Sequence, residues 1–322
     1  MTYAFQTEDL VKGFGTTTAL AGLNLRARWG TVLGVLGPNG AGKTTLIRVL
    51  ATLLRADSGR ALVGGMDVAT EAAHVRRMIG LTGQYAAVDE DLTGTENLRL
   101  LGQLLDLTAA QARARAAALL EQFGLSDAAM RRVRTYSGGM RRRLDLAASL
   151  VGRPRIVFLD EPTTGLDPGK REDLWRTIRS LAADGCTVLL TTQYLEEADA
   201  LADEITVIDH GSVIAHDTPA GLKHLVGGQI AVIQPRDPTM TEVAADTVQH
   251  LTGHAPDRTG RGVLTVPVNG EDEFARIVHH LRAADVEVSE LALRLPTLDE
   301  VFLTLTGGSA RAHTESKAGT AP

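Results

Sequence analysis

The chain has 322 residues, of which 44% are hydrophobic and 4% aromatic, with 33 basic against 39 acidic residues. This length exceeds that of one ordinary compact domain, and the apolar fraction suffices for a buried core, which argues against extended disorder. The net charge of −6 argues against a protein that wraps DNA, and the single cysteine, Cys186, excludes an internal disulfide. No uncharged apolar run approaches the roughly 18 residues that span a bilayer, and the first residues show no signal-peptide pattern, so we expect an intracellular protein.

Short apolar runs alternate with helical patterns over the first two-thirds of the chain, which predicts an α/β layered fold. Thr31–Leu36 is predicted to form a buried strand, followed by a glycine-rich turn and a helix from about Lys43 to Leu54. The segment Leu107–Phe123 is rich in alanine and carries leucines at helical spacing, which predicts a helical subdomain.

Three further apolar runs follow in the same part of the chain. Ile156–Leu159 and Thr187–Leu190 are continuous and short, as is typical of central strands that are covered on both faces of a sheet. Ile205–Ile208, followed by Asp209-His-Gly211, predicts a last hairpin. The first domain is therefore expected to end near residue 222.

The pattern changes after about Lys223. The predicted strands are Gln229–Gln234, Val263–Val268 and Val286–Leu293, and the predicted helices are Glu271–Ala284 and Leu298–Leu305. Together they predict a small α+β domain over residues 223–306. Residues 307–322 are small and polar, so we expect a disordered tail.

A glycine-rich loop lies between the first predicted strand and helix. Gly37-Pro-Asn-Gly-Ala-Gly42-Lys43-Thr44 fits the phosphate-loop pattern G-x-x-x-x-G-K-[ST] in the strand-to-helix context that the motif requires. Backbone N–H groups and the helix N-terminus favour phosphate, Lys43 adds a point charge, and the Thr44 hydroxyl suits Mg²⁺. The residues predicted to bind nucleotide here are Gly37, Pro38, Asn39, Gly40, Ala41, Gly42, Lys43, Thr44 and Thr45.

A second motif, Ile156-Val-Phe-Leu-Asp160-Glu161, is a predicted buried strand that ends in two carboxylates. Side chains alternate along a strand, so the two carboxylates diverge and can take different roles. We expect Asp160 to hold Mg²⁺ through water and Glu161 to orient or deprotonate the attacking water. Alone, the pair would fit a strand that meets a solvated turn equally well.

Kinases, GTPases and motor ATPases also carry phosphate loops. The chain lacks the [NT]-K-x-D motif that reads guanine, which disfavours a GTPase.

The segment Tyr136-Ser137-Gly138-Gly139-Met140 distinguishes among these classes. With it the chain resembles the ATP-binding subunit of an ABC transporter, in which an L-S-G-G-Q signature opens a helix. The resemblance implies that Ser137, Gly138 and Gly139 bind the γ-phosphate held by the other protomer of a dimer. It also implies a P-loop NTPase core of the ABC type over residues 1–222, with a helical subdomain inserted at about 85–150.

Further landmarks of that family follow in order along the chain. Gln84 matches the glutamine that senses Mg²⁺ and links the core to the helical subdomain, and Phe14 lies where the family stacks an aromatic ring on adenine. Thr164-Gly-Leu-Asp167 matches a loop that crosses the dimer interface. The resemblance thus implies that the Mg²⁺ of Mg·ATP is bound by Thr44, Gln84 and Asp160.

One position departs from the family's pattern. Members usually carry a histidine that contacts the γ-phosphate after the strand that follows the acidic pair, whereas this chain has Gln193. A glutamine amide can donate a hydrogen bond, but it cannot take up a proton and become positively charged as a histidine can. Catalysis by a charged histidine is therefore ruled out at this position. Glu161 and Gln193 are therefore the two expected catalytic residues.

Gln193, the signature segment Thr135–Leu144 and the segment Leu298–Gly307 together resemble the daunorubicin/doxorubicin-resistance type of drug exporter. The resemblance implies a homodimer that binds ATP and Mg²⁺ at the cytoplasmic face of the cell membrane and powers export through a separate integral membrane permease. It implies no nucleic-acid partner. The cargo is left open, because its path lies in the permease.

Two alternatives remain at this point. A soluble ABC-type ATPase that acts on ribosomes or DNA would need no permease, but such translation-type members usually carry two ATPase cores in one chain, and this chain shows one. A regulatory, non-transporting subunit is disfavoured by the intact Glu161.

Basic clusters flank the signature at Arg131–Arg134 and Arg141–Arg143. Aromatic residues are not interleaved with them, so a nucleic-acid site is disfavoured. We interpret both clusters as solvated helix faces, or as positive charge that attracts nucleotide and anionic lipid locally.

Overall fold

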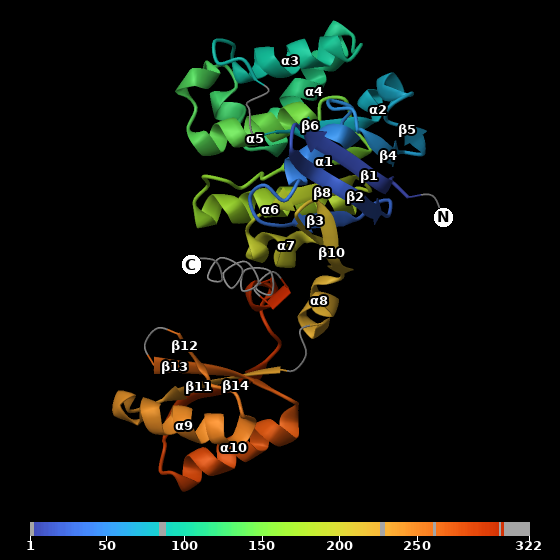
Figure 1. The fold of residues 1–322 in the computed structure, drawn as a ribbon. Coiled ribbons are helices and arrows are strands. Elements are labelled where there is room, and N and C mark those ends of the chain that lie inside the picture. The colour runs from blue at the N-terminus through green and yellow to red at the C-terminus, as the bar shows by residue number, and fades with distance from the viewer. Residues whose placement is uncertain (1–2, 84–87, 226–228, 260–261, 303, 306–322) are drawn as a thin grey trace, which may run out of the picture. The chain divides into compact units, whose positions relative to one another are not determined.

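The computed structural model of the chain describes residues 3–83, 88–225, 229–259, 262–302 and 304–305. The chain divides into two compact units, Met1–Pro219 and Ala220–Pro322, each with a sheet and a hydrophobic core of its own (Figure 1). Across these described ranges, no helix combines the length and the apolar character needed to cross a membrane.

A six-stranded sheet forms the centre of the first unit, in the order β10-β9-β3-β8-β7-β6. Its strands are β3 (Val32–Leu36), β6 (Ile79–Thr82), β7 (Ile156–Asp160), β8 (Thr187–Thr192), β9 (Glu204–Asp209) and β10 (Ser212–Asp217). All neighbours pair in parallel except β9 and β10, which form the predicted hairpin. Strands β3, β7 and β8 are buried along their whole length, as their continuous apolar runs predict.

Alternate side chains of the central strands enter two different cores. On one face, Phe158 of β7 meets Phe5 edge-on, with ring centroids 5.8 Å apart, and packs against an antiparallel sheet and α1. That sheet has the order β2-β1-β4-β5, with β1 (Phe5–Phe14), β2 (Thr17–Ala27), β4 (Ser58–Val63) and β5 (Met66–Asp67). On the other face, Val157 and Leu159 pack against α5, α6 and α7. The flanking helices are α1 (Lys43–Leu50), α2 (Ala72–Met78), α6 (Pro168–Ala183) and α7 (Leu195–Leu201).

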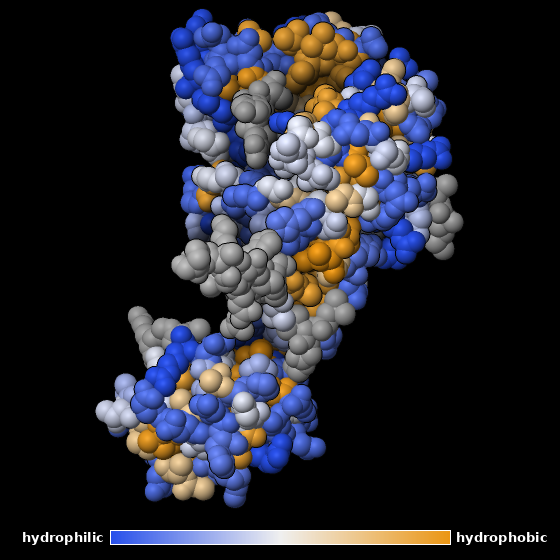
Figure 2. Space-filling view, viewed as in Figure 1, coloured by the Kyte–Doolittle hydropathy of each residue, from blue (hydrophilic) through white to orange (hydrophobic). Residues whose placement is uncertain are grey.

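Helices α3 (Gly94–Leu104), α4 (Ala109–Gln122) and α5 (Gly138–Ser149) gather at one end of the first unit (Figure 1). We call them the helical group. Thr93 with Glu96 caps α3, and Thr108 with Gln111 caps α4, each as a reciprocal capping box. Short 3₁₀ turns, η1 (Ser126–Ala128) and η2 (Val133–Thr135), connect α4 to α5. Figure 2 shows hydrophobic side chains over α3, whose exposed apolar residues include Leu100 and Leu104.

The second unit is an antiparallel sheet in the order β12-β13-β11-β14, with two helices packed on one face (Figure 1). Its elements are α8 (Pro219–Leu225), β11 (Gln229–Pro235), η3 (Pro238–Met240), α9 (Thr241–Thr252), β12 (Asp257–Thr259), β13 (Val263–Val268), α10 (Glu271–Ala283) and β14 (Val288–Arg294). Residues 298–302 and 304–305 are helical. The core joins β11 and β13 to both helices through residues such as Ile233, Val248, Val266 and Ile277.

The structure differs from the prediction at the end of one helix, and it contains elements that were not predicted, among them α9 and the antiparallel sheet β2-β1-β4-β5. The helix predicted over Lys43–Leu54 ends at Leu50, because Thr52 takes a left-handed φ of 62° and the N–H of Leu53 turns back to the Arg48 carbonyl at 2.8 Å. The sequence did not predict α9 because threonine and valine residues dilute its helical pattern. The fold class itself, a P-loop core with a helical group and an additional α+β unit, is confirmed.

Candidate active site

The carboxyl ends of three adjacent parallel strands bring the predicted site residues together. The phosphate loop follows β3, Asp160 and Glu161 lie at the end of β7, and Gln193 follows β8. Strand β8 pairs with both β3 and β7. Ligands of open α/β sheets bind at this edge, and the sheet order places the phosphate loop and the acidic pair there on either side of β8.

The phosphate loop depends on its glycines for two different reasons. A Cβ on Gly37 would lie 2.3 Å from the carbonyl oxygen of Ile208, and one on Gly42 would lie 2.3 Å from that of Ala19. Gly40 is exposed and has a left-handed φ of 85°, and no described atom lies within 4 Å of a Cβ added there, so its backbone conformation alone favours glycine. Gly42 offers no side-chain cap to α1, which leaves the first N–H groups of that helix for an anion.

The remaining residues of the loop lie as the motif predicts. Pro38 and Asn39 are exposed, and the N–H of Ala41 closes the turn onto the Pro38 carbonyl at 3.2 Å. Thr44 and Thr45 are half-buried in the first turn of α1. The loop therefore presents backbone and hydroxyl groups at its rim.

Lys43 is only 5% exposed. Its Nζ donates to the carbonyl oxygens of Gly37 and Pro38 at 2.8 and 3.1 Å, and it lies 4.0 Å from Oε1 of Glu161. Burial lowers the pKa of Lys43, whereas the nearby charges of Glu161 and Asp160 oppose that shift. The ammonium group is thus held inside the loop and close to the acidic pair.

The two carboxylates at the end of β7 have different surroundings. Asp160 is 3% exposed, and its Oδ1 accepts a hydrogen bond from the hydroxyl of Thr191 at 2.6 Å. Glu161 has a left-handed φ of 48°, and its Oε2 accepts a longer bond from Thr164 at 3.3 Å. The buried carboxylate of Asp160 is suited to act as a metal ligand held in one position. The carboxylate of Glu161 is less constrained and can face a reacting water.

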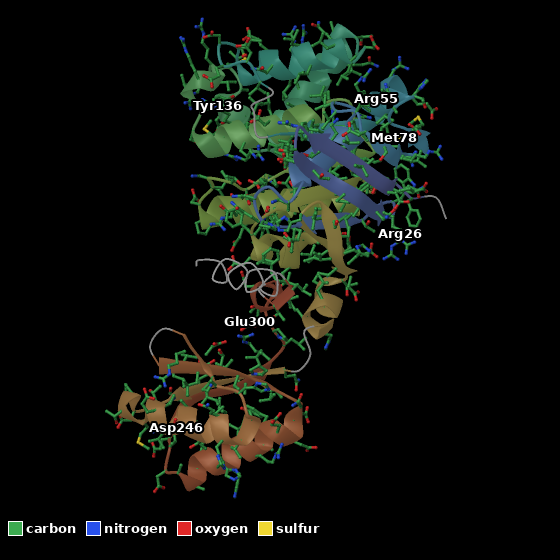
Figure 3. All side chains as sticks on the ribbon, in the orientation of Figure 1. Arg26, Arg55, Met78, Tyr136, Asp246 and Glu300 are labelled. Carbon is green, nitrogen blue, oxygen red and sulfur yellow. The ribbon has the colours of Figure 1, made fainter. Side chains whose placement is uncertain are left out.

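The signature segment forms the start of α5. Ser137 is the N-cap, and its Oγ accepts from the N–H of Met140 at 3.3 Å. Gly139 leaves room for Lys170, whose Cδ would lie 2.7 Å from an added Cβ, whereas no described atom lies within 4 Å of an added Cβ at Gly138. Tyr136 is buried in the helical group (Figure 3), and its hydroxyl donates to the Ala128 carbonyl at 2.8 Å, so the exchange of leucine for tyrosine is accommodated.

Two predicted contacts, Gln193 and Phe14, lie at the margin of the site. Gln193 is exposed directly after β8. Phe14 is 51% exposed at the end of β1, with the Lys12 ammonium 5.5 Å from its ring centroid. Its hairpin meets the phosphate loop through Ala19, which lies against Gly42. Gln84 lies outside the described residues.

Two residues of the site were not predicted. Thr191 contacts Asp160, and Arg142 donates to the carbonyl of Glu161 at 2.9 Å. The interpretation of Arg141–Arg143 as a solvated helix face is wrong for Arg142, because its guanidinium points inward to the end of β7. The available signal was helical spacing, since Arg142 shares a helix face with the buried Asp145 and Leu146.

A phosphate loop and an acidic pair at the ends of two parallel strands that flank β8, together with a helix that opens on Ser137, define a P-loop ATPase of the ABC class. The profile of the ABC transporter family matches residues 20–164.

Relatives extend this match over nearly the whole chain. The chain is 51% identical over 317 residues to the daunorubicin resistance ATP-binding protein DrrA2 of Streptomyces coeruleorubidus, covering 98% of each chain. It is 49% identical over 310 residues to the daunorubicin/doxorubicin resistance ATP-binding protein DrrA of Streptomyces peucetius, covering 96% of this chain and 94% of the relative. The chain therefore belongs to the family of ABC transporter ATP-binding proteins, in its daunorubicin/doxorubicin-resistance group, and is an ATPase.

Solved structures agree with this assignment. A nucleotide-free ATP-binding cassette from an ABC transporter superposes with a TM-score of 0.64 at 28% identity, covering 70% of this chain and 95% of that one. The ADP conformation of MJ1267, an ATP-binding cassette of an ABC transporter, gives a TM-score of 0.62 at 28% identity, covering 68% of this chain and 92% of that one.

Proposed function

We propose that this chain is the ATP-hydrolysing subunit of an exporter that moves a drug or another hydrophobic small molecule through a separate membrane permease. The names of its relatives, which connect them to daunorubicin and doxorubicin resistance, support the export role. The observation that carries the catalytic role is the 4.0 Å approach of Glu161 to Lys43, which puts a carboxylate next to the phosphate loop.

Each site residue has a distinct role in this proposal. The loop N–H groups and Lys43 bind the phosphates, Phe14 stacks on the adenine, and Glu161 orients or deprotonates the attacking water. Gln193 donates a hydrogen bond to the γ-phosphate. Positioning and electrostatics suffice for this reaction, because phosphoryl transfer needs little covalent assistance.

The residues present fit the Mg²⁺ that accompanies ATP. The Thr44 hydroxyl and the buried Asp160 carboxylate are hard oxygen donors, which Mg²⁺ prefers. We expect these two residues, together with Gln84, to hold the ion. When bound, it neutralises charge on the phosphate oxygens.

A homodimer would complete the site. No described atom lies within 4 Å of a Cβ added at Gly138, and its backbone conformation does not require glycine. Neither packing within the chain nor backbone geometry therefore explains this glycine, whereas a ligand that approaches from another copy would. We propose that Ser137, Gly138 and Gly139 of one copy bind the γ-phosphate held by the other copy. Two copies would then enclose two ATP molecules.

We further propose an ABC domain over residues 1–222, an accessory domain over 223–306 and a location at the cytoplasmic face of the membrane, where a permease can be reached. The accessory domain carries none of the nucleotide-binding residues. Truncation after Leu222 should leave nucleotide binding intact and weaken the dimer or its coupling to the permease. Loss of ATP binding in a truncated protein that circular dichroism shows to be folded would overturn this division.

Light scattering tests the dimer. Glu161→Gln keeps the phosphate loop but removes the carboxylate that activates water, so this variant should form a dimer of twice the monomer mass in Mg·ATP. Lys43→Ala should remain a monomer under the same conditions. A monomeric mass for Glu161→Gln at saturating nucleotide would contradict the two-site arrangement.

Drug efflux tests the export role. Cells that express the chain together with a candidate permease should retain less doxorubicin than cells in which the chain carries Glu161→Gln. Equal retention with every candidate permease, together with co-sedimentation of the chain with ribosomes rather than membranes, would support the permease-free alternative instead.

A further inference from the structure

The backbone of Glu161 is held in a conformation that non-glycine residues rarely adopt. Its φ is 48°, and such a left-handed residue persists only where its surroundings determine it. On the amide side, its N–H donates to the backbone carbonyl of Thr191 at 3.0 Å and to the Thr191 hydroxyl at 3.2 Å. On the carbonyl side, the contact comes from a side chain of α5.

That side chain is Arg142, in the second turn of α5. Its Nη2 donates to the carbonyl oxygens of Asp160 and Glu161 at 3.2 and 2.9 Å, and its Nε donates to that of Pro162 at 2.7 Å. Its Nη1 donates to the carbonyl of Gly83 at 3.0 Å, just beyond the end of the neighbouring β6. One guanidinium therefore binds three consecutive carbonyls at the end of β7 and one after β6.

The identity of this residue matters for geometric reasons. A guanidinium offers five N–H donors in a planar fork, whereas a lysine ammonium is a single point with three donors, which cannot reach carbonyls on different sides. Burial lowers the pKa of Arg142, but the charges of Asp145, Asp160, Glu197 and Glu161 oppose that shift, and arginine stays charged. The carboxylates that surround the cation belong to β7, α5 and α7.

We propose that Arg142 is a positioning residue for ATP hydrolysis. It fixes the backbone at Asp160–Pro162, so that the Glu161 carboxylate faces the phosphate loop. Arg142 also belongs to the helix that Ser137 caps, so the orientation of Glu161 follows the position of the signature helix in the same chain. The inference rests on the proposed role of Glu161 in activating water.

Steady-state kinetics of the full chain test this role. Arg142→Lys keeps the charge but loses the fork, so kcat should fall by roughly 10–100-fold, as small misplacements of catalytic groups do, while the Kd for ATP stays within about twofold. Arg143→Lys is the matched control, because its guanidinium donates to the Phe123 carbonyl at 2.9 Å, away from the acidic pair. It should retain the wild-type kcat.

A double-mutant cycle separates positioning from general support of the fold. In a Glu161→Gln background, Arg142→Lys should cause little further loss of residual hydrolysis, because residues that act as a unit are not additive. Wild-type kcat in Arg142→Lys, equal losses of kcat and ATP affinity, or full additivity with Glu161→Gln would each overturn the inference. So would failure of both Arg142→Lys and Arg142→Gln to fold, since it would assign a purely structural role. A wild-type rate in Glu161→Gln alone would instead contradict the proposed function.

Discussion

The hydroxyl of Thr191 donates a hydrogen bond to Oδ1 of Asp160 across 2.6 Å, at the point where β8 and β7 end side by side. The hydroxyl oxygen of Thr191 also accepts a hydrogen bond from the N–H of Glu161 at 3.2 Å. One hydroxyl therefore contacts the side chain of one acidic residue and the backbone of the next. Thr191 and Asp160 are both buried, so bulk water cannot easily replace this bond.

Thr191→Val should raise the Mg²⁺ concentration needed for half-maximal ATPase activity several-fold. Valine keeps the shape but removes the donor to a buried carboxylate, and a bond to a charged group is worth about 1.5–3 kcal/mol. A Mg²⁺ titration of ATPase activity measures the effect. Thr187→Val, at the other end of β8, removes an acceptor from the Gly30 N–H and should lower stability without altering the Mg²⁺ requirement. Identical titrations for the two variants would refute a role for Thr191 at Asp160.

Gln193→Ala should lower turnover by on the order of 10²–10³, as expected when a donor that serves the transition state is removed. Gln193→His should keep substantial activity, because imidazole can also donate a hydrogen bond from a similar position. Glu161→Gln should be more damaging than either change. Steady-state ATPase rates at matched nucleotide occupancy compare the three variants. A wild-type rate in Gln193→Ala would show that the exposed amide makes no catalytic contact.

Cys186 should resist alkylation in the folded protein. Burial raises the pKa of its thiol to about 11, and Sγ lies 3.6 Å from the Pro154 carbonyl. The thiolate is the nucleophile, and at pH 8 only roughly 0.1% of the thiol would be ionised at any moment, so alkylation should be slow. Mass spectrometry after iodoacetamide treatment should show little label in buffer and complete label in denaturant. Rapid labelling without denaturant would mean that the edge of β8 opens readily.

Acid should weaken the second unit partly through Glu300. Arg294 donates to both of its carboxylate oxygens, at 2.8 and 2.9 Å, and these bonds hold the pKa of Glu300 below its ordinary value of 4.5. A carboxylate with a lowered folded-state pKa stabilises the fold above its ordinary pKa, and this contribution is lost as the pH falls through the folded-state value.

Arg294→Gln should therefore lower the Tm at pH 7, and the difference from wild type should shrink as the pH falls below 4.5 and through the lowered folded-state pKa of Glu300. Thermal unfolding of the full chain at several pH values measures this. Arg236→Gln is the control, because its ion pair with Glu287 is largely exposed and should contribute little at any of these pH values. A Tm difference for Arg294→Gln that does not depend on pH would exclude the charge of Glu300 as its cause.

The sequence predicted the parts of the site that depend on local pattern. Continuous apolar runs identified β3, β7 and β8, and the glycine spacing identified the phosphate loop, because both follow from neighbouring residues. Thr191 could not be predicted in the same way, since its bond to Asp160 depends on the β7–β8 register, in which these two residues pair. Arg142 was missed because a run of arginines is usually solvated, and only the packing of α5 shows which one turns inward.

The alternation of side chains along β7 makes this strand sensitive to length. Asp160 occupies its position only in the register that pairs it with Thr191 and pairs Leu159 with Leu190. Deletion of one residue from β7 would bring Glu161 opposite Thr191 and turn the apolar residues that precede it into the wrong cores. Apolar substitutions in β7 can be absorbed by repacking, but insertions and deletions cannot, so we expect changes of length to be tolerated only in loops away from the catalytic edge.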